Sequence, residues 1–153
     1  TGRLVANYLV EGLLTTLRLS FWATLLALVV GLAVALFRTS SSLFLRLVGG
    51  AYVETIRNLP PLVLIFIFYY FVIDQLMPLL GIDAFIASRS VGGVRAIAVL
   101  FADQNLLTQF VSGVITLAFF EGAYFAEILR GGIESIERGQ REAAYSLGLS
   151  WAD

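Results

Sequence analysis

Residues 19–37 form an uninterrupted apolar stretch between Arg18 and Arg38, with no charged side chain inside it. A helix needs about 20 such residues to cross the roughly 30 Å of hydrocarbon in a bilayer. The whole chain is 59% hydrophobic and 14% charged, which gives more apolar surface than the core of a 153-residue soluble domain could bury. The sequence therefore predicts an integral membrane protein.

Two further apolar segments are long enough to consider as membrane spans. One opens at Pro60-Pro61, which a helix tolerates in its first turn, and ends near Pro78. The other closes before the helix-stopping pair Gly131-Gly132. We expect an all-α, polytopic helical membrane protein with a single transmembrane domain over residues 1–153, spans at about 12–37, 59–77 and 105–129, and a connection at about 78–104.

The ionisable residues exclude several classes of function. The net charge is −1 and all ten basic residues are Arg, so the concentrated positive charge that nucleic-acid binding needs is missing and we expect no nucleic-acid partner. With no His and no Cys, these residues cannot provide imidazole catalysis, thiolate chemistry or structural zinc. An intramembrane enzyme would have to use carboxylates or Ser–Arg pairs, and no span shows acidic residues spaced as an acid/base pair. We expect no catalytic residues, no cofactor and no metal in this chain.

Arginine placement predicts the orientation of the chain, because cytoplasmic loops beside membrane spans hold the excess of basic residues. The loop between the first two spans and the tail after the third must lie on one side, and together they hold six Arg against four on the other. The N-terminus is therefore expected outside and the tail in the cytoplasm. The six are Arg38, Arg46, Arg57, Arg130, Arg138 and Arg141.

A short amphipathic helix is predicted at about residues 134–148, because apolar or small side chains recur there at steps of three and four. The small Ala143 and Ala144 would let a partner approach the backbone closely. Glu142 offers a fixed charge, and Gly148 can take the left-handed conformation that turns the chain. Docking into a partner and lying flat in the headgroup region are equally compatible with this periodicity.

Four motifs follow one another along the chain: residues 16–20 (T-L-R-L-S), 52–62 (Y-V-E-T-I-R-N-L-P-P-L), 123–133 (A-Y-F-A-E-I-L-R-G-G-I) and 139–148 (G-Q-R-E-A-A-Y-S-L-G). They resemble the T-L-x-L-S, Y-V-E-x-x-R-x-x-P-L, A-Y-x-A-E-I-x-R-G-G-I and G-Q-x-E-A-A-x-x-x-G motifs of permease subunits of bacterial binding-protein-dependent ABC importers, in their polar amino acid branch. The chain departs from that branch at residues 57–60, where R-G-T-P is frequent and R-N-L-P stands here.

The resemblance implies a permease that moves polar amino acids across the bacterial inner membrane by alternating access. It also implies a five-helix core, of which this chain would hold three helices and a cytoplasmic coupling helix as a C-terminally truncated form, with residues 78–104 in the periplasm. The implied partners are an ATP-binding cassette ATPase, a second permease copy or homologue, an extracytoplasmic amino-acid-binding protein and the lipid bilayer. ATP and Mg belong to the ATPase, since the chain has no G-x-x-x-x-G-K-[ST] phosphate loop. The implied coupling residues are Gly139, Gln140, Glu142, Ala143, Ala144 and Gly148.

Glu121 lies inside the third predicted span, where a carboxylate is costly unless it faces protein, water or a basic partner. It is either a candidate for the substrate path or a member of a structural polar pair. The i,i+3 spacing also predicts two ion pairs, Glu127 with Arg130 and Glu54 with Arg57. A channel or secondary transporter, which needs no ATPase, stays open as an alternative function.

Overall fold

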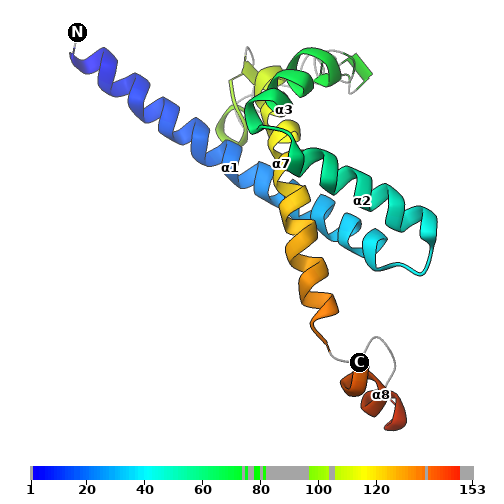
Figure 1. Ribbon diagram of the computed structural model, residues 1–153. Coiled ribbons are helices and arrows are strands. Elements are labelled where there is room, and N and C mark those ends of the chain that lie inside the picture. Colours follow the sequence, from blue (N-terminus) through cyan, green and yellow to red (C-terminus); the bar gives the residue numbers. More distant parts are fainter. Residues whose placement is uncertain are drawn as a thin grey trace.

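The computed structural model describes residues 2–73, 75, 78–79, 81, 97–103, 106–136 and 138–148. All regular secondary structure in these ranges is helical, which confirms the predicted all-α class. Most of the connection predicted at residues 78–104 lies outside the described residues. The helices (Figure 1) are α1 (Gly2–Thr39), α2 (Leu43–Asn58), α3 (Pro61–Ile67), the π-helix η1 (Phe68–Ile73), α7 (Leu107–Glu134) and α8 (Arg138–Ser146).

Helices α1 and α7 cross at the centre of the structure and make its most extensive helix–helix contact. Each is long and apolar enough to cross a bilayer, over Tyr8–Thr39 and Leu107–Glu134 respectively. Small residues let their backbones approach closely, as is common between membrane helices. The buried small residues on the two helices include Ala23, Ala27 and Ala35 of α1 and Ala118, Ala123 and Ala126 of α7.

Helix α2 was not predicted from the sequence. It folds back along the C-terminal part of α1 (Figure 1), and its buried residues Gly49, Val53 and Ile56 recur at steps of four and three. That spacing makes one face of α2 apolar and leaves Arg46 and Arg57 exposed on the others. A search for charge-free stretches passes over such a helix because its charges are distributed along its length.

The chain breaks sharply between α2 and α3. Leu59 and Pro60 are both extended, with ψ values of 139° and 136°, and the chain bends by 113° between α2 and the helical segment Pro61–Phe71. Proline disfavours the helical conformation in the residue before it, so Pro60 and Pro61 together end α2, and Pro61 then begins α3. If this bent pair counts as one span, the described residues contain up to three spans.

The core lies where α2 and α3 pack against the middle of α7. Its buried side chains are small or aliphatic, and the hydroxyl of Tyr52 on α2 donates a hydrogen bond to the carbonyl of Phe119 on α7. This packing fixes the C-terminal half of α7 against both α1 and α2. The buried residues of the cluster are Val53, Ile56, Leu64, Ala123 and Ala126.

Candidate functional site

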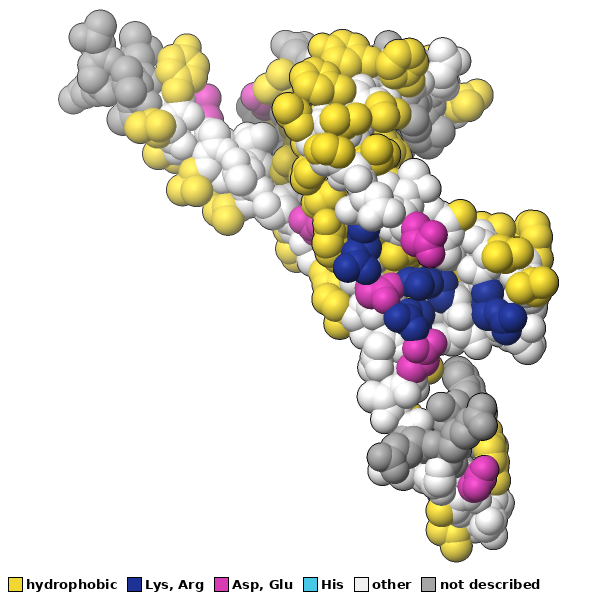
Figure 2. Space-filling view, in the orientation of Figure 1, with side chains coloured by type: hydrophobic (Ala, Val, Ile, Leu, Met, Phe, Trp, Pro, Cys, Tyr) yellow, Lys and Arg dark blue, Asp and Glu magenta, His cyan; other side chains and the backbone are white. Residues whose placement is uncertain are grey.

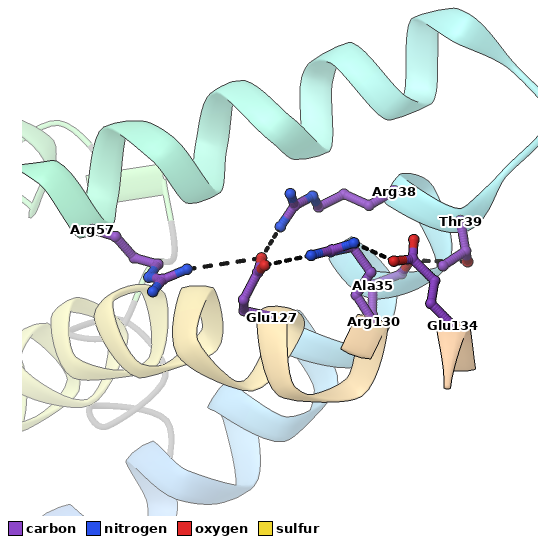
Figure 3. A network of polar contacts seen from close by, with 7 residues as sticks. All are labelled: Ala35, Arg38, Thr39, Arg57, Glu127, Arg130 and Glu134. Carbon is purple, nitrogen blue, oxygen red and sulfur yellow. Dashed lines mark hydrogen bonds and ion pairs between the residues drawn. The ribbon is translucent and has the colours of Figure 1, made fainter. Parts of the chain in front are cut away.

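A cluster of charged side chains joins three helices near the C-terminal end of α7 (Figure 3). Glu127 accepts a hydrogen bond from Nη2 of Arg130, one turn further along α7, at 2.6 Å. Its other carboxylate oxygen accepts from Nη1 of Arg38 on α1 and lies 3.9 Å from Nη1 of Arg57 on α2. Arg130 also donates to Glu134. These five residues are called the charge cluster below.

The charge cluster is partly shielded from solvent. The side chain of Arg38 is 17% exposed and that of Glu127 is 29% exposed. On the face shown in Figure 2, most of the charged side chains gather in one patch, and apolar side chains cover the part of this face above it. Arg38 and Arg57 stand in the last turns of α1 and α2, where a positive charge is favoured by the helix dipole. Ion pairs in such partly buried places are screened less by salt than fully exposed pairs.

The structure confirms one of the two predicted ion pairs. Glu127 and Arg130 form the expected i,i+3 pair. The Glu54–Arg57 pair was predicted wrongly, because Arg57 turns toward α7, where it reaches Glu127 and places its Cζ 5.5 Å from the centre of the Tyr124 ring. Local spacing could not indicate this, since the preferred partners of Arg57 come from a distant part of the sequence.

Arg38 is one of the two cluster members, with Glu134, for which the sequence predicted no ion-pair partner. It follows the first apolar stretch directly, and the count of basic residues places it on the same side as Arg57 and Arg130. The three guanidinium groups do meet at one carboxylate, so these residues lie at the same end of the helix bundle. The sequence could therefore indicate that Arg38 lies on the same side of the membrane as Arg57 and Arg130. Its contact with Glu127 could be recognised only in the folded structure.

Helix α8 follows the cluster by a short connection and extends away from the crossing helices (Figure 1). Helix α7 ends with the backbone N–H of Ser135 donating to the carbonyl of Gly131 at 3.0 Å. Just after the C-terminal end of α8, the backbone N–H of Gly148 donates a hydrogen bond to the carbonyl of Tyr145, at 3.0 Å. Gly148 has a φ of +79°, the left-handed conformation that the sequence predicted for it.

The described side chains that were predicted to couple this chain to a partner are all exposed. Tyr145 and Leu147 beside them are 55% and 80% exposed, so α8 also presents apolar surface to its surroundings. The side chain of Ala144 lies outside the described residues. The exposed predicted residues are Gly139, Gln140, Glu142, Ala143 and Gly148.

Glu121 lies about two turns before the charge cluster on α7 and is partly exposed. Among the described residues, its carboxylate has no hydrogen-bond or ion-pair partner. Tyr124 and Ile128 follow at i+3 and i+7, which places them on the same side of the helix, and they are 41% and 68% exposed. Glu121 therefore lies on a partly exposed side of α7 that also carries Tyr124, over whose ring the guanidinium of Arg57 is placed. No group of acidic residues in the described ranges could hold a metal ion.

These features define an integral membrane protein of helical type, with an exposed helix beyond the bundle. The chain belongs to the family of binding-protein-dependent transport system inner membrane components, whose family model matches residues 12–153.

Relatives within this family are named as amino acid permeases. The chain is 30% identical to the glutamate/aspartate import permease protein GltK of Escherichia coli O157:H7, covering 94% of the chain and 55% of that protein. It is 32% identical to the probable glutamine ABC transporter permease protein GlnM of Bacillus subtilis (strain 168), covering 93% of the chain and 53% of that protein. The chain spans about half the length of the curated relatives it matches.

A solved structure shares this architecture. The crystal structure of an amino acid ABC transporter with histidines matches 90% of the chain and 51% of the solved chain, at 33% sequence identity and a TM-score of 0.59. The helical fold predicted from the sequence is therefore one that an amino acid transporter adopts.

Proposed function

We propose that this chain is the membrane-spanning part of an ATP-driven importer of polar amino acids. It belongs to the family of binding-protein-dependent transport system inner membrane components. The names of the two relatives given above include glutamate, aspartate or glutamine. The protein would move its substrate by alternating access. It would work with a second copy or homologue and with an amino-acid-binding protein outside the membrane.

The exposed helix α8 is the observation that carries the ATP-coupling part of the proposal. Glu142 and Ala143 are exposed on a helix that extends beyond the bundle, and the left-handed Gly148 follows the end of that helix. Small side chains on a docking helix let the partner approach its backbone closely. In this proposal α8 enters the ATPase subunit, which holds ATP and Mg.

The orientation follows from the arginines. Arg38, Arg57 and Arg130 lie together at the end of the bundle from which α8 extends. Positive charge beside membrane spans favours the cytoplasmic side. The charge cluster and α8 would thus face the cytoplasm of a bacterial inner membrane, with the N-terminus outside.

Glu121 is our candidate for the substrate path. A charged group within a span generally faces a protein interior or a water-filled cavity. Glu121 has no partner among the described residues and is partly exposed on α7, which leaves it accessible to a substrate. Its carboxylate would interact with the ammonium group that every free amino acid carries.

Reconstitution tests the proposal. The full-length permease, its ATPase and its binding protein are incorporated into proteoliposomes, and uptake of labelled glutamate, glutamine and leucine is measured with ATP and with a non-hydrolysable analogue. We expect uptake of a polar amino acid that requires both ATP hydrolysis and the binding protein. Uptake that persists without the ATPase would indicate a channel or secondary transporter and contradict the proposal.

A further inference from the structure

Glu127 occupies a special place in the charge cluster because it is the acceptor that all three helices share. Arg38 reaches it from α1, Arg57 from α2 and Arg130 from within α7 itself (Figure 3). The second acceptor, Glu134, contacts Arg130 alone among the described residues and is 51% exposed. One carboxylate therefore joins the C-terminal ends of α1 and α2 to α7.

The balance of charge makes this carboxylate necessary for the arrangement. Three guanidinium groups converge on Glu127, and like charges this close repel one another unless an opposite charge lies between them. Removing the negative charge would leave Arg38 and Arg57 without an acidic partner among the described residues. A partly buried charge that loses its partner is costly, and the side chain of Arg38 is 17% exposed against 42% for Arg57, so Arg38 and the end of α1 would be displaced most.

The surrounding packing transmits such a displacement. Gly49 of α2 lies against the stem of Arg38, and a Cβ placed on it would come within 2.8 Å of Arg38 Cγ. A Cβ on Gly122 of α7 would come within 2.9 Å of Val30 on α1. At these two points the helices are in direct contact, so a displacement of one presses on its neighbour.

We propose that Glu127 is a positioning residue that locks the C-terminal ends of α1 and α2 to α7. This inference rests on the proposed function where it concerns transport: a displacement of α8, passed into α7, is shared with α1 and α2 through Glu127. Without the Glu127 carboxylate, α7 still moves with α8, but α1 and α2 no longer move fully with α7.

The lock itself can be tested without any transport assay. Spin labels are attached to cysteines at Ser41, between α1 and α2, and at Ser135, after α7, in the full-length permease in lipid nanodiscs. Glu127→Gln should at least double the width of the distance distribution between the labels, whereas Glu54→Gln should leave it unchanged. Glu54 is the matched control because it is exposed and has no ion pair among the described residues. An unchanged width in Glu127→Gln would overturn the inference.

A second variant covers the case in which Glu127→Gln does not insert into the membrane. Arg38→Gln removes only the contact from α1 and leaves Glu127 paired with Arg130. It should broaden the same distribution, by less than Glu127→Gln. If Arg38→Gln inserts normally and the distribution stays as narrow as in the wild type, α1 is not held through Glu127 and the inference is wrong.

The consequence for transport is measured as the number of amino acids moved per ATP hydrolysed. We expect Glu127→Gln to lower this ratio about tenfold while the ATPase still copurifies, and Glu127→Asp to recover part of it. Glu54→Gln should keep the wild-type ratio. A wild-type ratio in Glu127→Gln would contradict the role in coupling. If the wild-type protein shows no ATP-driven uptake at all, the proposed function fails, while the label distances still decide whether Glu127 locks the helices.

Discussion

Gly31 of α1 and Phe125 of α7 pack so closely that a Cβ placed on Gly31 would lie 2.6 Å from the Cβ of Phe125. The same Cβ would also lie 3.1 Å from the backbone nitrogen of Ala126 and the carbonyl oxygen of Gly122. Backbone atoms cannot move aside as a flexible side chain can. Gly31 therefore sets the distance between the two longest helices.

The first prediction is that Gly31→Val destabilises the helix pair. Overpacking a close contact typically costs about 1–3 kcal/mol, and the nearby backbone places this site toward the upper end of that range. The thermal unfolding midpoint of the purified full-length protein in detergent should fall. Gly50→Ala is the control, because a Cβ on Gly50 of α2 meets nothing within 4 Å. Equal unfolding midpoints for Gly31→Val and Gly50→Ala would contradict the prediction, because α1 and α7 would then move apart to accommodate the added side chain.

The second prediction concerns orientation. Single cysteines at Ser42 and Ser135 should both be protected from a membrane-impermeant thiol reagent added outside intact cells, because both positions lie at the end of the bundle that holds the charge cluster. A cysteine at Ser90, in the connection predicted to lie outside, should react. Both protected positions should react once the membrane is permeabilised. Labelling of Ser135 in intact cells would reverse the proposed orientation.

Much of the fold could be predicted because apolar length and proline pairs are local signals, but the pair Gly131-Gly132, which was predicted to stop the third helix, lies inside α7, which ends at Glu134. The apolar stretch after Arg18 lies within α1. Helix α3 begins at Pro61, at the proline pair where the sequence predicted a helix start. Helix α2 was missed because it carries Arg46 and Glu54 within an amphipathic pattern, and a search for charge-free spans does not detect such a helix.

The charge cluster was only partly predictable for a different reason. The i,i+3 spacing of Glu127 and Arg130 is visible in the sequence, and the structure confirms that pair. Arg38 lies 89 residues from Glu127 along the chain, so their contact exists only after α1 and α7 cross. The roles assigned to Glu121 and to the residues of α8 stay predictions, since contacts with partners decide them.

The third prediction is that Glu121→Gln changes transport more than Glu54→Gln does. Among the described residues neither Glu121, which lies within a membrane helix, nor the exposed Glu54 of α2 has an ion-pair partner, but only Glu121 lies where an unpaired charge is costly. Glutamine keeps the size of the side chain and removes the charge. We expect Glu121→Gln to reach wild-type levels in the membrane and to raise the KM for uptake severalfold. Near-normal uptake in both variants would assign Glu121 to a structural contact.

The fourth prediction tests α8 through the backbone of Gly148. Its φ of +79° lies in the left-handed region, where a β-branched residue is strained and asparagine is tolerated far better. A Cβ on Gly148 meets nothing within 4 Å, so Gly148→Val and Gly148→Asn differ in backbone preference rather than in crowding within the chain. Gly148→Val should redirect the end of α8, abolish recovery of the ATPase with the tagged full-length permease, and leave membrane insertion intact.

Gly148→Asn should keep most of the ATPase recovery and of the binding-protein-stimulated ATP hydrolysis, because asparagine can adopt the same turn. Glu142→Gln should act differently from both Gly148 variants. It would remove one charge-assisted hydrogen bond, which contributes roughly 1.5–3 kcal/mol, so we expect weaker recovery of the ATPase. We expect a larger loss of binding-protein-stimulated ATP hydrolysis. Both quantities are measured on the same purified preparations, which separates docking from coupling. If Gly148→Val matches the wild type in both, α8 does not dock through this turn, and another part of the permease must contact the ATPase.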